Sequence, residues 1–600
     1  MPSFRPSLTA LAVALAFAPA AASAQFSDAF VFGDSLSDAG QFGGARFTTN
    51  PGLTIPMYVT QRYGISVTPS DAGGTDWALG GARVNTPQGN LPPGIPDLSV
   101  AAQVSAQLAK GPPNTGALYQ IQGGANDIFV LSEQAAAGQI TPAQLQGGVT
   151  QAAADLAAQV GRLKAAGARY IVVYNMPDIG TTPAAAALGQ QANLTALSTL
   201  FNTALNGALQ GSGLQVIQVN AFLLSQEIKA NPAAFGFVNS TIPVCTTASS
   251  LNCTPQTLRD PNGNLTWAFA DSIHPTTGTA LIGAAAAESM IEAPSKIGAL
   301  AEAPIQVEQA NFRSIDGRMF SGLGASRTPN KFNAWAAYDY ATNDIIGPYL
   351  SGNANQNTIT VGIDGKVTGH FLLGGALGWS QNKGDFGNNS GDFTLKESIG
   401  TIYAGWGDGP WYVGGTLGGG SLDYSNVTRN IQLGALGRSE TGETRGWQAF
   451  GSVLGGYWFQ WDRLTHGPWA RLSFQEIRVN AYAENGSDST ALQFGEQRRK
   501  SFITSLGWQG VGDFDNFRPF ARVTWEIESK DGDRDVTAAP VTLGTSYSMP
   551  TIKPDNSWAN FLVGASANFG SVTGYLTGTA TAGKSDGNVY SVTVGVRIPI

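Results

Sequence analysis

A two-residue alternation of apolar and polar side chains recurs from residue 331 to the C-terminus and constrains the fold more than any other feature. It is clearest at the end of the chain, where every second residue from Tyr590 to Ile600 is aromatic or aliphatic. The intervening residues are small, polar or proline. Successive side chains of a strand point to opposite faces, so this segment would present one apolar and one polar face.

About twelve such segments follow one another over residues 331–600, and many have about ten residues or more, enough for a tilted strand to cross a membrane. Aromatic side chains gather at segment ends, as at Trp406 and Trp411, which bracket the turn Gly407–Pro410. Rings in this position are typical of the girdles of membrane barrels. We therefore expect an all-β transmembrane barrel of about 12 strands, with a soluble β-sandwich or second secreted β domain as the alternative.

The composition of the whole chain agrees with this expectation. Of its 600 residues, 76 are glycine, 10% are aromatic and only 13% are charged, as many alternating strands with glycine turns would produce. The length exceeds one ordinary domain, so at least two are expected. A formal net charge of −8 without a basic stripe argues against a nucleic-acid partner.

Residues 1–24 have the pattern of a secretory signal peptide. Arg5 supplies a positive charge, Leu8–Ala18 is apolar, and Ala22–Ala24 is a small-residue cleavage site. The apolar run is too short to span a membrane comfortably, which disfavours an uncleaved anchor. We expect an exported chain whose mature form begins at Gln25.

Residues 25–295 alternate short apolar runs with helical patterns. The runs that predict strands include Leu118–Ile121, Tyr170–Tyr174 and Leu214–Val219. One helix is expected to be capped by Thr141 and to end at Gly167, and the last helix of this part to end at Pro294. Strand–helix alternation predicts a parallel sheet covered by helices on both faces, a three-layer α/β domain.

Four short stretches of this domain carry residue types used in hydrolysis. They contain Ser35, Gly81, Asn126, and Asp271 with His274. Taken singly, each has a structural explanation: a helix cap, a Gly-Gly turn, an Asn/Asp turn, and a capping aspartate beside an exposed histidine. The serine, asparagine and histidine stretches all lie at predicted strand ends or helix starts, so they can converge on one sheet edge.

In this order the stretches resemble the four blocks of the GDSL lipase/esterase family, also called SGNH hydrolases. The resemblance implies a catalytic triad of Ser35, Asp271 and His274. It also implies an oxyanion hole formed by the Ser35 N–H, the Gly81 N–H and the Asn126 side-chain amide. Four blocks spread over the domain in order are far more specific than any one of them.

The chemistry explains why these residue types are needed. A serine hydroxyl needs an adjacent base, and His274 can take its proton and later return it to the departing alcohol. Asp271, three residues earlier, can accept from the other ring nitrogen and hold the tautomer. Glycine suits the oxyanion position because the backbone must approach the substrate without a Cβ. Both Gly80 and Gly81 fit that position, and we prefer Gly81.

Other features of the first half have structural interpretations. No Gly-x-Ser-x-Gly motif is present, which disfavours the α/β-hydrolase fold. Asp34 and Asp38 flank the nucleophile and are interpreted as turn and capping residues. Cys245 and Cys253 lie in one Thr/Ser/Asn/Pro-rich loop, and in an exported protein we expect them to form a local disulfide.

No metal site is expected. The acidic run Asp531–Asp535 resembles the start of a calcium loop, but Val536 and Thr542 occupy the positions that require Gly and Glu. His370 and His466 lie in the barrel half without a visible ligand cluster. The reaction is likewise expected to need no cofactor.

A connector is expected over residues 296–330, with a helix from about Ile297 to Met319 that Pro304 breaks weakly. A solvated interdomain helix is the alternative. An exported α/β domain followed by a helix and a C-terminal β-barrel resembles the autotransporter (type V secretion) layout. That layout implies a barrel in the outer membrane, a helix threading its lumen and an esterase outside. One departure is the terminal Ile600, where the family usually has Phe or Trp.

The two resemblances together imply a cell-surface serine carboxylesterase acting through an acyl-serine intermediate. They further imply an ester or lipid substrate, contact with outer-membrane lipid, insertion by the barrel-assembly machinery, and a monomeric chain. A lipase or phospholipase acting on long-chain substrates is the alternative. An alternative from another class is a displayed binding or adhesion module with vestigial catalytic groups.

Overall fold

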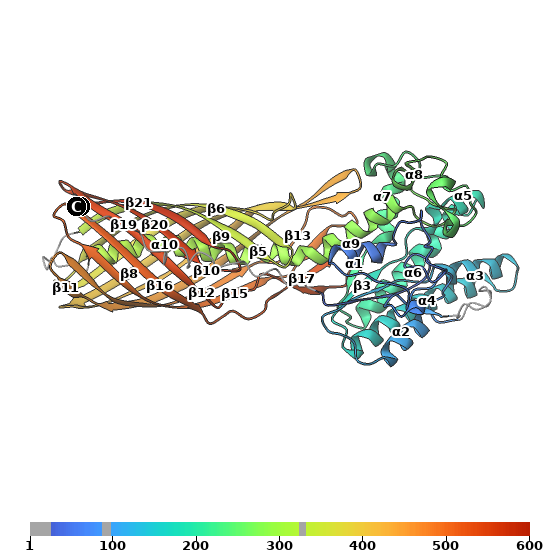
Figure 1. Ribbon diagram of the computed structural model, residues 1–600, viewed down its shortest axis with the longest axis horizontal. Helices are drawn as coiled ribbons and strands as arrows, with labels where there is room; N and C mark the ends of the chain where they lie inside the picture. Colours follow the sequence, from blue (N-terminus) through green and yellow to red (C-terminus); the bar gives the residue numbers. More distant parts are fainter. Residues whose placement is uncertain (1–25, 87–97, 323–331) are drawn as a thin grey trace, which may run out of the picture.

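The computed structural model describes residues 26–86, 98–322 and 332–600, so the expected signal peptide (1–24) lies outside the described residues. Figure 1 shows an elongated molecule with an α/β domain at one end and a barrel at the other. A long helical segment joins them and continues into the barrel. We call the α/β domain the passenger.

The passenger is built on four parallel strands in the order β1 (Ala29–Phe32), β2 (Leu118–Ile121), β3 (Tyr170–Tyr174) and β4 (Ile217–Val219). Each strand is completely buried, as expected of a parallel sheet covered on both faces. In the register of the sheet, Phe32 lies opposite Ile121, which lies opposite Val173. The carboxyl ends of β1, β2 and β3 therefore reach the same edge.

Helices cover both faces of this sheet, which confirms the three-layer prediction. One apolar cluster joins one face to α1 (Ile55–Arg62) and α9 (Thr277–Ile297). A second joins the other face to α2 (Val100–Ala109), α4 (Pro142–Ala166) and α6 (Gln191–Gly211). The remaining α-helices are α3 (Ala125–Ala136), α5 (Pro183–Ala187), α7 (Ala221–Ala230), α8 (Gly263–Thr266) and α10 (Ala299–Gly322). Across the described ranges, no helix combines the length and apolar character of a membrane span.

Local signals fixed the ends of α4 as expected. The hydroxyl of Thr141 accepts a hydrogen bond from the Gln144 N–H, and the Gln144 side chain accepts one from the Thr141 N–H. This reciprocal arrangement is a capping box. Gly167 ends the helix in the left-handed conformation, with φ of 115°.

The second half is a closed antiparallel barrel. Its sheet contains 13 strands, and the pairing of β10 with β12 closes all of them except the three-residue β11 (Phe459–Trp461) into a ring of twelve. The ring consists of β5 (Phe332–Gly347), β6 (Leu350–Lys366), β7 (Phe371–Asp385), β8 (Gly391–Asp408), β9 (Trp411–Leu433), β10 (Leu436–Tyr457), β12 (Leu464–Val479), β15 (Gln497–Gly512), β16 (Phe517–Glu528), β19 (Ser557–Phe569), β20 (Val572–Ala582) and β21 (Val589–Pro599).

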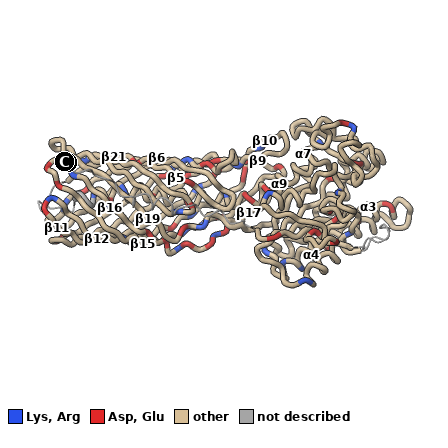
Figure 2. Tube along the Cα trace, in the orientation of Figure 1, with Lys and Arg blue, Asp and Glu red and all other residues tan. Residues whose placement is uncertain are grey.

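The wall of the barrel has its apolar side outside and its polar side inside. In β6, Ile359, Val361 and Ile363 are 52%, 38% and 56% exposed, whereas Thr358 and Thr360 are 1% exposed. A soluble sandwich would bury the aliphatic side chains, so this arrangement decides for a membrane barrel. Charged residues are sparse along the middle of the barrel and more frequent at its far end and where its strands approach the passenger (Figure 2).

Several strands extend beyond the length that a membrane requires. β9 and β10 contain 23 and 22 residues, and their hairpin reaches the passenger (Figure 1). Beside the passenger, four short strands form a further sheet, namely β13 (Tyr482–Ala483), β14 (Leu492–Phe494), β17 (Asp535–Pro540) and β18 (Tyr547–Pro550).

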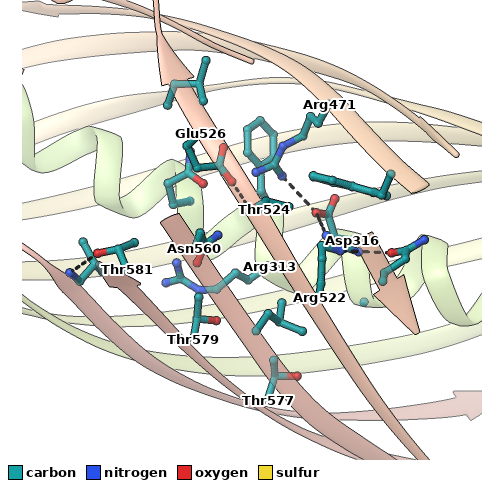
Figure 3. A pocket seen from close by; sticks show the side chains of 18 of the residues that line it. Arg313, Asp316, Arg471, Arg522, Thr524, Glu526, Asn560, Thr577, Thr579 and Thr581 are labelled. Carbon is teal, nitrogen blue, oxygen red and sulfur yellow. Dashed lines mark hydrogen bonds and ion pairs between the residues drawn. The ribbon is translucent and has the colours of Figure 1, made fainter. Parts of the chain in front are cut away.

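Helix α10 lies inside the barrel lumen, where ion pairs join it to the wall (Figure 3). Arg313 donates to both carboxylate oxygens of Asp339 on β5, at 2.9 and 2.7 Å. Asp316 accepts from Arg471 of β12 and Arg522 of β16, at 3.1 and 3.4 Å. The lumen-threading prediction is confirmed, and the interpretation as a solvated linker is wrong. A cavity of about 790 Å³ remains beside the helix.

Helix α9 does not end at Pro294, as the sequence had suggested, but continues to Ile297. A proline inside a helix lacks the N–H that would bond to the carbonyl four residues earlier, here that of Met290. The hydroxyl of Tyr547, from β18, donates to the Met290 carbonyl at 2.7 Å instead. The replacement donor removes much of the cost of continuing through the proline.

The same device recurs in α10. Pro304 leaves the carbonyl of Leu300 without its helical donor, and the hydroxyl of Tyr424 on β9 donates to it at 2.6 Å. The connector helix is therefore α10, from Ala299 to Gly322, close to the expected span from Ile297 to Met319, and it meets the end of α9 at Gly298.

Candidate active site

Ser35 lies in the tight turn after β1, at the carboxyl edge of the sheet. The turn is held by Gln103 from α2, whose buried side chain is 0% exposed. The Gln103 amide accepts from the Gly33 N–H and donates to the Gly33 carbonyl, both at 2.8 Å. These two bonds hold the backbone of Gly33, two positions before Ser35, and so help to fix the direction in which the serine points.

The histidine and aspartate predicted from the sequence lie next to this serine. The distance from His274 Nε2 to Ser35 Oγ is 2.9 Å. On the opposite side of the ring, His274 Nδ1 lies 3.0 and 2.9 Å from the two oxygens of Asp271. The three groups form a continuous chain in which the carboxylate orients the imidazole and the imidazole faces the hydroxyl.

Asp271 is 4% exposed and surrounded by donors. Burial alone would raise the pKa of its carboxyl, but the His274 ring and the Ser250 N–H favour the charged form and hold that pKa well below its usual range. The backbone N–H groups of Ile273 and His274 also donate to it, at 3.0 and 2.8 Å. The carboxylate is therefore charged wherever the domain is folded near neutral pH.

One of these donors belongs to a loop that the sequence did not connect with the site. Ser250 N donates to Asp271 Oδ2 at 2.8 Å, and Ser250 lies inside the loop closed by the disulfide between Cys245 and Cys253. The Cα atoms of these cysteines are 5.7 Å apart. Asn50 donates to the Ser250 carbonyl at 2.9 Å and ties the loop to the passenger. Backbone donors carry no residue signature, so no pattern could have identified this one.

The geometry separates the two glycines that sequence reasoning left open. The N–H of Gly80 donates to Asp38 Oδ2 at 2.8 Å and is therefore occupied. Gly81 lines the same cavity as Ser35 and has φ of 85°, a conformation that favours glycine. Asn126, in the first turn of α3, also lines the cavity and donates one amide hydrogen to the Ala82 carbonyl at 2.9 Å. A side-chain amide has two such hydrogens.

The acidic residues beside Ser35 stabilise the turn. Asp34 accepts from the Leu36 N–H at 3.1 Å and from the Gln122 amide at 2.7 Å. Asp38 accepts from the N–H groups of Gly40 and Gln41, both at 2.8 Å. Burial raises the pKa of both carboxyls. They lie within the turn, as expected of capping residues.

A cavity of about 380 Å³ opens beside the three groups. Much of its wall is apolar and is formed by Phe129, Ile179, Leu224, Ile228, Phe269 and Ile273. The ring of Phe47 packs on His274 with a centroid distance of 4.9 Å, which covers one face of the imidazole. An apolar pocket with a few convergent polar groups is the usual form of a small-molecule site.

Comparison with known proteins identifies both halves. Residues 30–286 match the family described as GDSL-like Lipase/Acylhydrolase, and residues 334–597 match the Autotransporter beta-domain. Esterase EstA of Pseudomonas aeruginosa is 30% identical over 91% of this chain and 91% of its own length. The chain belongs to the GDSL autotransporter esterases and lipases.

The chain is also similar to a further lipase and to a solved translocator domain. Lipase 1 of Photorhabdus luminescens is 25% identical to this GDSL autotransporter over 95% of the chain and 96% of its own length. The translocator domain of the autotransporter NalP from Neisseria meningitidis has a TM-score of 0.40 and 16% identity, covering 50% of this chain and 98% of that one.

Membership of the GDSL autotransporters makes this chain an ester hydrolase of the GDSL type. It also places the barrel in the outer membrane and the passenger at the cell surface.

Residues that the sequence analysis rejected as metal ligands contact other groups of the protein. Within the acidic run, Asp533 pairs with Lys553 at 3.0 Å and Asp535 with Arg169 at 2.9 Å. His370 Nδ1 lies 3.0 Å from the Gly407 carbonyl oxygen. Over the part of the chain that the structure describes, no three His, Cys, Asp or Glu residues are grouped in a way that could hold a metal ion.

Proposed function

We propose that this protein is a cell-surface carboxylesterase that cleaves carboxylic esters through an acyl-Ser35 intermediate. One observation carries the proposal: a serine hydroxyl 2.9 Å from an imidazole nitrogen whose other nitrogen is bound to a buried carboxylate. The proposed reaction uses protein groups and water only.

In the first half-reaction, Ser35 Oγ attacks the ester carbonyl carbon while His274 Nε2 accepts the hydroxyl proton. The ring becomes positively charged, and the Asp271 carboxylate stabilises that charge and keeps Nδ1 protonated. When the tetrahedral intermediate collapses, the bond to the alcohol oxygen breaks and His274 returns the proton to that oxygen. The alcohol leaves and the acyl group stays on Ser35.

In the second half-reaction, water replaces the alcohol. His274 accepts a proton from water as the oxygen attacks the acyl carbon, and then returns it to Ser35 Oγ as the acid is released. The enzyme regains its starting protonation state.

Each tetrahedral intermediate carries a negative oxygen that preorganised donors can stabilise. We assign that role to the backbone N–H groups of Ser35 and Gly81 and to the second amide hydrogen of Asn126. All three residues line the cavity. Loss of one such donor typically costs about 3 kcal/mol of transition-state stabilisation.

The acyl chain is proposed to lie in the apolar cavity beside Ser35. A cavity of about 380 Å³ with aromatic and aliphatic walls suits the acyl chain of a water-soluble, monomeric ester. The same walls could hold the end of a lipid acyl chain, so a lipase or phospholipase is the second candidate. The chain is proposed to act as a monomer in contact with outer-membrane lipid, after insertion by the barrel-assembly machinery.

The test is hydrolysis of p-nitrophenyl esters by intact cells that display the wild type or Ser35→Ala. The matched control is Ser105→Ala, which removes an exposed α2 hydroxyl bonded to its own helix. We expect kcat of Ser35→Ala to fall by at least about 10⁴-fold and that of the control to stay unchanged. Equal activity in all three proteins would exclude Ser35 as the nucleophile, and activity that requires cell lysis would exclude surface display.

A further inference from the structure

Helix α7 forms one wall of the substrate cavity without carrying a catalytic group. Ala221, Leu224, Ser225 and Ile228 of this helix line the cavity. With only ten residues, such a helix has little stability of its own and depends on what packs against it. What holds α7 in place therefore decides the shape of the cavity.

Part of its support comes from the barrel. Leu224 and Ile228 belong to an apolar cluster that includes Ile431 and Leu433, at the tip of β9. These two barrel side chains are only 7% and 0% exposed. They pack with Phe235 and other passenger residues behind the cavity wall. The wall and the barrel hairpin thus share one apolar core.

A polar contact fixes the middle of the same helix. Glu227 of α7 accepts from Arg438 of β10 at 2.7 Å. It also accepts from the Ser489 N–H at 2.7 Å and from the Ser489 hydroxyl at 2.9 Å. The Glu227 and Arg438 side chains are only 17% and 12% exposed, so their interaction is less screened than a surface pair.

The barrel also contacts the segments that flank α7. Asn220 caps the helix by accepting from the Leu223 N–H, and its amide donates to the Thr542 hydroxyl at 2.9 Å. Beyond the other end, Ala435 N donates to the Phe235 carbonyl at 3.2 Å. At Gly434, a Cβ would come within 2.5 Å of that carbonyl oxygen, so the hairpin approaches as closely as glycine allows.

We infer that the extracellular part of the barrel completes the acyl-binding cavity by holding α7, and that it thereby sets the preference of the enzyme for longer acyl chains. We call the contacts of Ile431, Leu433, Arg438, Ser489 and Thr542 with the passenger the α7 clasp. The inference rests on the proposed function, because it concerns the substrate of the same site.

The clasp acts on selectivity for a geometric reason. Ser35, Asp271 and His274 are held by the β1 turn and the disulfide loop, which do not belong to α7. If α7 shifts, the catalytic groups keep their contacts while the cavity wall loses its fit to an acyl chain. A short acyl group, which needs little of that wall, is affected less than a long one.

The experiment uses the full chain in detergent micelles, with active sites counted by an irreversible phosphonate ester. Leu433→Ala and Arg438→Ala weaken the apolar and polar parts of the clasp separately. We expect each to lower the ratio of kcat/KM for p-nitrophenyl octanoate to that for the acetate by about tenfold, the size of effect that a changed apolar pocket contact produces. The loss should lie mainly in KM for octanoate.

Two controls separate this effect from a general disturbance. Asp535→Asn breaks another contact between barrel and passenger, the exposed pair with Arg169, and should leave the ratio unchanged. Arg438→Lys keeps the positive charge near Glu227 and should recover part of the ratio. Leu433→Ala and Arg438→Ala act on different contacts. If one of the two variants does not fold into the barrel, the other alone still tests the inference.

An unchanged ratio in both clasp variants would overturn the inference, as would an equal loss on both esters through kcat. A change in the ratio that Asp535→Asn also produces would overturn it too. The proposed function is judged separately, because its failure requires Ser35→Ala to retain activity.

Discussion

Asp271 receives hydrogen bonds from three backbone N–H groups and one imidazole. These donors more than offset the effect of burial and lower the pKa of its carboxyl. The same hydrogen-bond donors therefore account for the fixed position of Asp271 and for its proposed catalytic role. The donors that keep it charged also fix its direction toward His274.

This environment predicts a simple acid limb in the pH profile. Because the pKa of the Asp271 carboxyl lies well below the ordinary 3.8, this carboxyl keeps its charge as pH falls toward about 4. It therefore adds no second proton to the acid limb, and we expect the logarithm of kcat/KM to fall with a slope no steeper than one over this range. A slope of two above about pH 4 would mean that the carboxyl titrates there as well.

The lowered pKa of the Asp271 carboxyl also makes the stability of the passenger depend on pH. A carboxyl whose pKa is lower in the folded than in the unfolded state stabilises the fold above its unfolded pKa of about 3.8. That contribution is lost as pH falls through the folded pKa. In Asp271→Asn the passenger should therefore lose less stability between neutral and strongly acid pH than the wild type, as measured by thermal unfolding.

At the scale of helices, two prolines show how residues of the barrel half support α9 and α10, the helices that join the passenger to the barrel. Pro294 and Pro304 each free a helical carbonyl, and in each case a tyrosine hydroxyl of the barrel side supplies the missing donor. A buried carbonyl without a partner costs about 1–3 kcal/mol. The two tyrosine hydroxyls therefore lower the cost of continuing α9 and α10 through their prolines.

Tyr424→Phe tests this dependence. It removes the donor to Leu300 and should lower the stability of the barrel by about 1–3 kcal/mol, measured by heat unfolding in detergent. Tyr590→Phe is the matched control, because that side chain is 52% exposed on the outer wall and should change stability by less than about 0.5 kcal/mol. Equal effects of the two substitutions would contradict the capping role.

These elements also show what the sequence could and could not predict. The residues proposed for catalysis were predictable because each has a distinctive side chain in a motif, and the wall of the barrel because its alternation is local. The predicted helix end at Pro294 was wrong because the hydroxyl that compensates for the proline belongs to Tyr547, 257 positions after the Met290 carbonyl that it bonds. The Ser250 donor and the apolar cluster that Leu433 shares with α7 were missed for related reasons. The first is a backbone group, and the second joins two domains.

At the scale of the whole molecule, the chain crosses the barrel once as a helix before forming the wall. The seam joins β5 and β21, and the N–H of Ile600 donates to the Phe332 carbonyl at 2.9 Å. The terminal isoleucine therefore takes part in closing the barrel. Both ends of the wall lie at the barrel end remote from the passenger (Figure 1), so α10 must run the length of the lumen. The position of the passenger on the barrel then depends in part on how firmly the lumen holds α10.

Ion pairs between α10 and the wall provide that hold, and their strength can be measured. Asp339 is 1% exposed, so Arg313→Ala leaves a buried carboxylate without its partner and should cost about 3–5 kcal/mol of barrel stability. Adding Asp339→Asn removes the unpaired charge, and the Thr593 hydroxyl, which bonds to this carboxylate at 2.6 Å, can still bond to an amide. The double variant should therefore regain most of the loss.

The comparison is a set of heat-unfolding curves in detergent for both single variants, the double variant and Arg518→Ala. Arg518 pairs with Asp513 at 3.2 Å, but both side chains are more than half exposed, so its loss should cost less than about 1 kcal/mol. If Arg313→Ala cost no more than Arg518→Ala, the lumen would be too wet for the pair to matter. If the double variant were as unstable as Arg313→Ala, the loss would come from packing of the arginine side chain. Only a large single loss with recovery in the double variant fits a helix held in the lumen by buried charge.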